Sequence, residues 1–116
     1  MATHPTSLSQ LISIEEYLNT TYRPDVDYVD GEIEERNPGE FEHGRVQGFL
    51  VTWLTTHEVE WHIQVLPEQR VRVTTARVRI PDVCVLSATL PRERIISHPP
   101  LLRVEVLPLR LRSGSE

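Results

Sequence analysis

The stretch 69–86, QRVRVTTARVRIPDVCVL, decides the fold, because its pattern changes from alternating to continuously apolar. Valines and isoleucine alternate with arginines over 69–74 and again over 77–80, and this period of two residues is typical of β-strands. Thr75-Ala76 allows a turn between the two segments. The second strand is expected to continue through Pro81 into the apolar run Val83–Leu86. The stretch therefore predicts a hairpin that leads into a buried strand.

Two further strand-like segments flank this hairpin. Trp61–Leu66 precedes it, and Leu101–Leu107 follows after a loop over 87–100 that is bounded by prolines. Leu101–Leu107 is apolar apart from Arg103 and Glu105. Because continuous apolar strands are typically central in a sheet, we expect this strand to lie inside the sheet.

The N-terminal part predicts a helix, a hairpin and a longer helix. Ser13 followed by Glu16 forms a capping box for a helix to about Asn19. Asp30-Gly31 joins strands at 26–29 and 32–35. Asn37-Pro38-Gly39-Glu40 predicts the start of a helix of about five turns. Its apolar stripe is expected to face the core and contains Val46, Phe49, Leu50, Trp53 and His57. This order predicts an α/β or α+β fold, with a mixed sheet and the long helix on one face.

Composition limits the class of protein. The chain has 116 residues, enough for one domain, and its formal net charge is −5, which does not favour nucleic acid but leaves room for a local basic surface. All 12 basic residues are arginine. Met1–Ser9 does not resemble a secretory signal, and the apolar runs are too short to span a membrane. Cys84 is the one cysteine, so an internal disulfide is excluded, and we expect a small apolar role for it in a cytoplasmic protein.

Two acids interrupt apolar segments. Asp82 precedes Val83–Leu86, and Glu105 lies within Leu101–Leu107. A carboxylate in such a segment costs free energy unless it is paired or binds a cation, and Mg²⁺ sites use one or two carboxylates with water and substrate phosphate. Asp82 could instead be a strand-start acid, and Glu105 could pair with Arg79 or Arg103. Their occurrence on neighbouring strands favours a shared metal site.

Polar residues at the start of the long helix could join this site. Glu42 is a candidate third carboxylate, and His43 could contact a phosphate or a water. Both could equally be solvated residues, since acids favour helix N-termini. Four arginines are predicted on one hairpin face, where they could bind a nucleic-acid backbone or be merely solvated: Arg70, Arg72, Arg77 and Arg79.

Five segments in order resemble the Uma-two-type endonucleases, which have a restriction-endonuclease-like fold of the PD-(D/E)xK superfamily. They are ISIEEYL, YVDGEIEE, EHG, RIPDVCVLS and PPLLRVEVL, and they cover Ile12–Leu107. The resemblance implies a mixed sheet flanked by helices. It also implies a catalytic site at Asp82 and Glu105, with Glu42 as the acid near the helix start. There Mg²⁺, or Mn²⁺, would activate a water for hydrolysis of DNA.

The chain departs from this family after EVL. The family continues with a lysine-bearing helix and further strands, whereas this chain continues with PLRLRSGSE. We therefore expect a C-terminally truncated endonuclease-like domain over 1–107 with an unstructured tail over 108–116. Impaired catalysis is expected, with exposed apolar surface and possible homodimers. The alternative is a non-catalytic remnant that binds nucleic acid or a partner chain.

Overall fold

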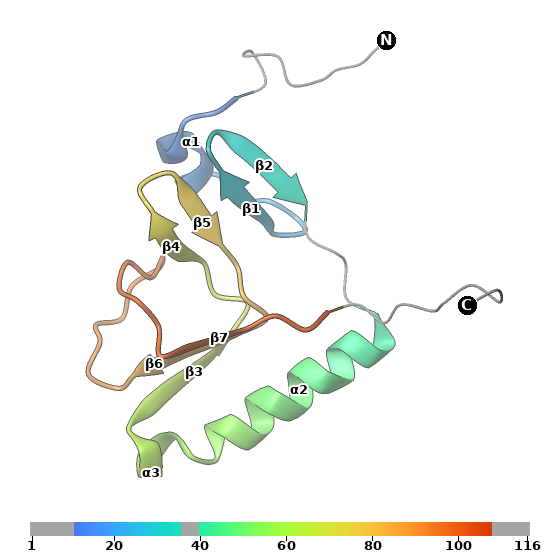
Figure 1. The fold of residues 1–116 in the computed structure, drawn as a ribbon, viewed down its shortest axis with the longest axis vertical. Helices are drawn as coiled ribbons and strands as arrows, with labels where there is room; N and C mark the ends of the chain where they lie inside the picture. The colour runs from blue at the N-terminus through green and yellow to red at the C-terminus, as the bar shows by residue number, and fades with distance from the viewer. Residues whose placement is uncertain (1–10, 36–39, 108–116) are drawn as a thin grey trace, which may run out of the picture.

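The computed structural model describes residues 11–35 and 40–107 and shows two antiparallel sheets with helices (Figure 1). The elements are α1 (Ile14–Leu18), β1 (Val26–Val29), β2 (Glu32–Glu35), α2 (Phe41–Thr55), α3 (Glu58–Trp61), β3 (Ile63–Pro67), β4 (Val71–Thr74), β5 (Arg77–Arg79), β6 (Val83–Ser87) and β7 (Leu102–Val104). The sheet orders are β2-β1-β5-β4 and β3-β6-β7. The expected α+β class is confirmed. The described strands pair antiparallel, and a parallel contact occurs at the isolated bridge between Val71 and Ile96.

The N-terminal elements follow their local signals closely. The Ser13 hydroxyl accepts a hydrogen bond from the Glu16 N–H at 3.0 Å, as a capping residue does. Asp30 and Gly31 both have positive φ, 52° and 92°, which the tight turn between twisted strands requires. A side chain at Gly31 would also meet Leu11. The predicted helix and hairpin are therefore confirmed. Asn37-Pro38-Gly39 lies outside the described residues, and α2 begins after Glu40.

The expected second strand of the hairpin is divided between the two sheets. We expected one strand from 77 to 86, but β5 belongs to the four-stranded sheet and β6 to the three-stranded sheet. Ile80, Pro81 and Asp82 connect them and are all buried. Proline has no N–H to donate to a sheet, so strand pairing is interrupted at this point. The break places Asp82 at the junction of the two sheets.

Two other strand predictions need correction. Trp61 belongs to α3, and β3 starts only at Ile63 after the left-handed His62. The segment Leu101–Leu107 is not central: β7 covers three of its residues and forms an edge of its sheet as described. Leu102 is 47% exposed, whereas all of Val83–Leu86 is buried. Both segments have a continuous apolar pattern, but only β6 is covered on both faces. The pattern alone therefore could not show which segment is central.

The two faces of β6 contact different clusters. One cluster, with Val83 and Val85, packs against Leu54 of α2. The other joins Cys84 and Leu86 to Val71 and Ile96. Burial raises the pKa of the Cys84 thiol to about 11. The expectation that Cys84 acts as a small buried apolar residue is confirmed.

The predicted core stripe of α2 is correct for Leu50 but wrong for three of its larger apolar residues. Val46, Phe49 and Trp53 are 44%, 66% and 46% exposed. The residues that face the sheet are Leu50, Val51 and Leu54. Apolar residues occupy too wide an arc of α2 for the pattern to select one face. The rotation of the helix is set by Leu50 and Leu54 together with the polar contacts described below.

Tyr17 is the centre of the core beneath the four-stranded sheet. It is fully buried, packs on Tyr28 with ring centroids 5.1 Å apart, and donates a hydrogen bond to the Val26 carbonyl at 2.6 Å. Burial raises its pKa from 10.0 to about 12, opposed by the nearby Arg70. The neutral phenol is therefore the form that the folded chain stabilises.

We predict that Tyr17→Phe makes the chain less sensitive to alkali. Below about pH 10 the phenol is neutral in both states, and its stabilisation is fully present. As pH rises through 10 toward 12, the unfolded chain ionises first, so this stabilisation is lost. Urea unfolding at pH 8 should show a loss of about 1 kcal/mol in the variant, from the missing hydrogen bond. The difference from the natural chain should shrink at pH 11, and an unchanged difference would contradict the assignment.

Candidate metal site at the sheet junction

Asp82 is the buried charged residue of the described chain, with 3% of its surface exposed. Its carboxylate accepts a hydrogen bond from the Val106 N–H at 2.6 Å and lies 3.2 Å from the His43 imidazole Nε2. Its carbonyl accepts from the Gln47 side chain at 2.9 Å. The residue therefore fastens the N-terminal half of α2 and the segment after β7 to the sheet junction.

Glu105 directly follows β7, and Asp82 directly precedes β6, so both acids lie at the same end of this strand pair. Val83 pairs with Val104, so the next position in this antiparallel register sets Asp82 opposite Glu105. Directly opposed residues of antiparallel strands point to the same face, with Cβ atoms about 4.5–5.5 Å apart. Asp82 is anchored through Val106, the residue after Glu105. Two carboxylates thus come from the ends of two adjacent strands.

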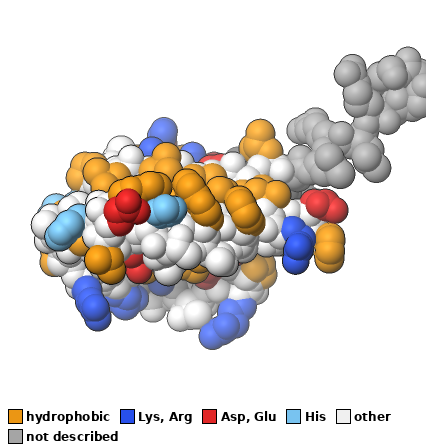
Figure 2. Space-filling model, turned by 90° about the horizontal axis from the view of Figure 1, so that it is seen from below, with side chains coloured by type: hydrophobic (Ala, Val, Ile, Leu, Met, Phe, Trp, Pro, Cys, Tyr) orange, Lys and Arg blue, Asp and Glu red, His pale blue; other side chains and the backbone are white. Residues whose placement is uncertain are grey.

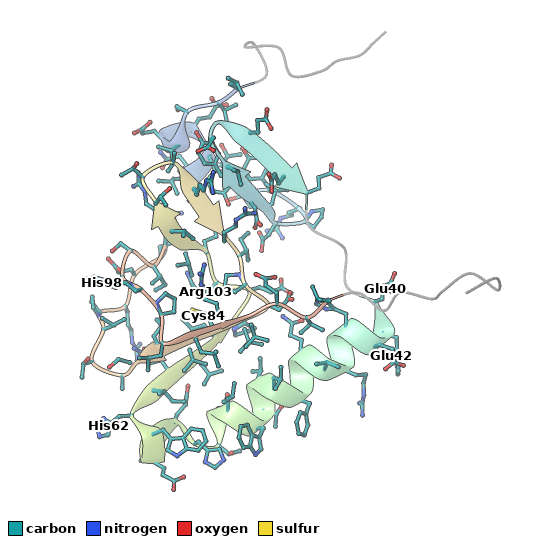
Figure 3. All side chains as sticks on the ribbon, viewed as in Figure 1. Glu40, Glu42, His62, Cys84, His98 and Arg103 are labelled. Carbon is teal, nitrogen blue, oxygen red and sulfur yellow. The ribbon has the colours of Figure 1, made fainter. Side chains whose placement is uncertain are left out.

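Glu105 also lines a pocket of about 430 Å³ together with Asp27, Arg79 and Arg103. Arg103 pairs with Cys84 across β6 and β7, and Figure 3 shows the two residues together in the middle of the molecule. Asp27 was not selected as a candidate site residue from the sequence. It interrupts the apolar strand β1, which is the same signal that identified Asp82 and Glu105.

The start of α2 contributes a different residue from the one expected. Glu42 is exposed, and Figure 3 shows it at the end of α2 with its side chain directed away from the sheets. Its neighbour His43 faces inward and contacts Asp82. The second ring nitrogen of His43, Nδ1, is buried with no hydrogen-bond partner. His43, Gln47, Leu50 and Leu54 follow one another at helical spacing, which explains the rotation of α2 toward the sheet.

The four hairpin arginines do not share one face. Arg79 pairs with Val71 and Arg72 with Val78, so Arg72 and Arg79 occupy alternate positions of the register and point to opposite faces. Arg70 lies with its guanidinium 5.4 Å from the centre of the Tyr17 ring. Arg77 forms an ion pair with Asp30 at 3.0 Å. The expected basic ribbon is therefore wrong as a surface, because alternation and local acids divide the four charges.

Arg79 connects β5 to both strands of the neighbouring hairpin. Its guanidinium lies 3.2 Å from Asp27 and 3.1 Å from Glu34. Burial acts to lower the pKa of Arg79, but the hydrogen bonds that its guanidinium donates to Asp27 and Glu34 outweigh it and raise the pKa. The second oxygen of Asp27 accepts from the Ile80 N–H at 3.1 Å. Asp27 is thus held at the pocket wall by Arg79 and by the backbone.

The donor set at the junction suits a hard cation held by few protein ligands. Among the described residues, no group of three or more His, Cys, Asp or Glu side chains gathers as a metal cage. Asp82 and Glu105 offer carboxylate oxygens from neighbouring strand ends, and Mg²⁺ is commonly held by one or two carboxylates with waters and substrate phosphates. The two acids therefore fit Mg²⁺ in that manner and do not form a closed structural site.

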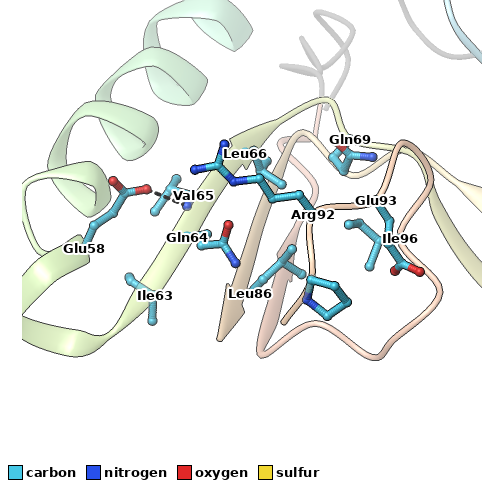
Figure 4. Close-up of a pocket in the computed structure, with 11 residues that line it drawn as sticks. Glu58, Ile63, Gln64, Val65, Leu66, Gln69, Leu86, Arg92, Glu93 and Ile96 are labelled. Atoms are coloured by element: carbon cyan, nitrogen blue, oxygen red, sulfur yellow. Dashed lines mark hydrogen bonds between the residues drawn. The ribbon is translucent and has the colours of Figure 1, made fainter. Parts of the chain in front are cut away.

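A second pocket, of about 420 Å³, lies beside β3 (Figure 4). Its lining includes Glu58, Gln64, Arg92 and Glu93. The Glu58 carboxylate accepts a hydrogen bond from the Val65 N–H at 2.8 Å. It contains neither Asp82 nor Glu105. The Gln64 amide donates to the carbonyls of Ser87 and Leu90, so it fastens the loop after β6. We assign this pocket no part in the candidate site.

The class of protein is given by comparisons with known proteins, the first of which concerns the fold. A crystal structure described as a putative nuclease belonging to DUF820, from Anabaena variabilis ATCC 29413, has a TM-score of 0.75 and 19% sequence identity. The match covers 90% of this chain and 63% of that one, so this chain spans less than two-thirds of that protein. No curated protein sequence matches.

The Uma2 family, described as "Putative restriction endonuclease", matches residues 14–109. The chain therefore belongs to the Uma2 family. The resemblance seen in the sequence is confirmed. The matched range includes Asp82 and Glu105, and also Glu42 and His43 at the start of α2. None of the described helices is long and apolar enough to cross a membrane.

We predict different costs for removing the ion pairs of Arg79 and that of Arg77. Arg79→Gln should lower the free energy of unfolding by about 1 kcal/mol, because it removes two ion pairs that are partly shielded and hold Asp27. Arg77→Gln is the matched control. It removes one pair in which both side chains are about half exposed, so its cost should stay below about 0.5 kcal/mol. Urea unfolding measures both, and equal costs would show that the Arg79 network has no special role.

Proposed function

We propose that this chain carries the metal site of a DNA endonuclease, in which Asp82 and Glu105 hold Mg²⁺ or Mn²⁺. The proposal is supported by the burial of Asp82 at the junction of the sheets and by the β6–β7 register, which sets Asp82 opposite Glu105 when it is continued by one position. When bound there, the metal would supply Lewis-acid stabilisation of a phosphate and a more acidic water. DNA as the substrate follows from the family, and the cytoplasm is the proposed location.

The neighbouring side chains have separable roles in this proposal. His43 and the Val106 N–H fix one oxygen of Asp82, so the orientation of the carboxylate is set before any ligand arrives. Arg103 lines the same pocket as Glu105 and is exposed, so it can meet a phosphate there. Arginine is suited to this task because its guanidinium binds phosphate oxygens in pairs. Asp27 and Arg79 form the opposite wall of the pocket.

The first test measures the binding of Mn²⁺ to the chain by calorimetry. Asp82→Asn and Glu105→Gln should each weaken binding at least tenfold, because each removes one anionic oxygen ligand. Glu105 is exposed, so its variant should fold normally. Glu32→Gln removes an exposed acid from β2 and is the matched control. Glu42→Gln shows whether the third acid expected from the sequence takes part.

Unchanged Mn²⁺ affinity in both Asp82→Asn and Glu105→Gln would overturn the proposed site. The same measurement separates the proposal from its alternative, a chain that binds DNA or a partner without catalysis. Such a remnant needs no metal, so DNA binding that is independent of Mn²⁺ and of Asp82 would favour it. Circular dichroism of each variant verifies that the fold is retained.

The second test is cleavage of supercoiled plasmid DNA by the 116-residue chain with Mn²⁺. We predict little or no cleavage, because the chain contains no lysine to offset charge on the phosphate. A preorganised donor of this kind commonly contributes about 3–4 kcal/mol, a factor of roughly 10²–10³ in rate. Arg103 can supply charge but stays protonated and cannot act as a base. Robust cleavage that disappears in Asp82→Ala would contradict this expectation.

A further inference from the structure

Large apolar side chains are exposed along α2 and α3 on the side of the helices that faces away from the sheet. Figure 2 shows a band of hydrophobic side chains on this side of the molecule. We call it the apolar band, and its members with their exposed fractions are Phe41 (77%), Val46 (44%), Phe49 (66%), Trp53 (46%) and Trp61 (46%). Four of the five are aromatic, a composition typical of protein interfaces.

The C-terminal end of the band is rigid. The His57 ring stacks on Trp61 with centroids 4.0 Å apart and an interplanar angle of 8°. Trp53 packs edge-on against both rings, at 4.9 Å from His57 and 5.8 Å from Trp61. The Glu60 carboxylate holds His57 Nδ1 at 3.0 Å. A surface fixed in this way loses little side-chain entropy when it is covered.

The exposed area is in the range that a small dimer needs. An aromatic side chain presents roughly 200 Å², so the four aromatic residues together expose roughly 450 Å². With Val46 and a polar rim, the contact would approach about 600 Å² on each copy. That lies at the low end of specific interfaces, which bury about 1,200–2,000 Å² in total. The expected association is weak, with a dissociation constant on the order of micromolar.

The charges beside the band disfavour nucleic acid as its occupant. Glu42, Glu58 and Glu60 lie on α2 and α3, against Arg45 alone among the lysines and arginines of these two helices. Phosphates would be repelled by this local excess of acid. The band is therefore suited to a protein surface.

We propose that the apolar band joins two copies of this chain through antiparallel packing of α2 on α2, with a two-fold axis near Phe49. Val46 lies about 4.5 Å before Phe49 along the helix and Trp53 about 6 Å after it. In the antiparallel arrangement, the small side chain of Val46 meets the large ring of Trp53 from the other copy. Phe41, eight residues before the axis, falls near the rigid cluster at His57. The same patch thus complements itself, as a two-fold interface requires.

This contact leaves the candidate metal site open. His43 and Gln47 reach Asp82 from a separate arc of α2, on which Leu50 and Leu54 pack against the sheet. The band and the site therefore occupy different faces of one helix. The proposal for the dimer does not depend on metal binding or on catalysis, and its tests use neither.

Sedimentation velocity of the full 116-residue chain over about 1–200 µM tests the proposal. The natural chain should shift from monomer to dimer as concentration rises, and Phe49→Glu should raise the dissociation constant at least tenfold. Val59→Glu is the matched control, because Val59 is 91% exposed on α3 and lies outside the band. It introduces the same charge nearby and should leave dimerisation unchanged.

Cysteine crosslinking locates the two-fold axis. Phe49→Cys should form a disulfide between two copies under mild oxidation, whereas Val59→Cys should form far less. Cys84 is buried, so the natural chain serves as the uncrosslinked reference. A monomer at all concentrations would overturn the proposal. So would a dimer, or larger assemblies, that persists in Phe49→Glu without crosslinking at position 49, since another surface would then be responsible.

Discussion

The contacts of Asp82 hold together the parts of this fold that the two sheets alone do not connect. Its carboxylate accepts a hydrogen bond from the Val106 N–H and contacts the His43 imidazole, and its carbonyl accepts a hydrogen bond from the Gln47 amide. An ionised group removed from water requires such partners, because unpaired burial is costly. The N-terminal half of α2, the junction between β5 and β6 and the end of β7 thus converge on one residue. The acid proposed as a metal ligand is thus also a residue that joins three parts of the local structure.

The features that the sequence predicted correctly depend on neighbouring residues, whereas the features that it did not predict depend on contacts between distant parts of the chain. The capping Ser13, the Asp30-Gly31 turn and the alternation around 69–80 are local signals, and each produced the expected element. The division of the strand at Pro81 and the edge position of β7 depend on which segments cover which face. That information lies in contacts between residues far apart in the chain, so the apolar pattern could not supply it.

The candidate site divides in the same way. Asp82 and Glu105 could be identified because each interrupts apolar residues, and the register brings the two strand ends together. Asp27 carries the same signal but stands in a short hairpin, where an acid is unremarkable. The choice between Glu42 and His43 depends on the rotation of α2, which Gln47, Leu50 and Leu54 set through tertiary contacts. The sequence predicted one surface for the four hairpin arginines, but the strand register places them on different faces of the sheet.

Burial of Cys84 gives the chain an internal reporter of its own opening. With a thiol pKa of about 11, only about one molecule in a thousand carries the reactive thiolate at pH 8 while the strand stays covered. Cys84 pairs with Arg103, and each candidate acid lies two residues from this pair, Asp82 from Cys84 and Glu105 from Arg103. Alkylation at that sulfur therefore records how often the cluster of Val71, Leu86 and Ile96 opens around it. The rate of labelling measures the local opening of the packing beneath β6, the strand that follows Asp82.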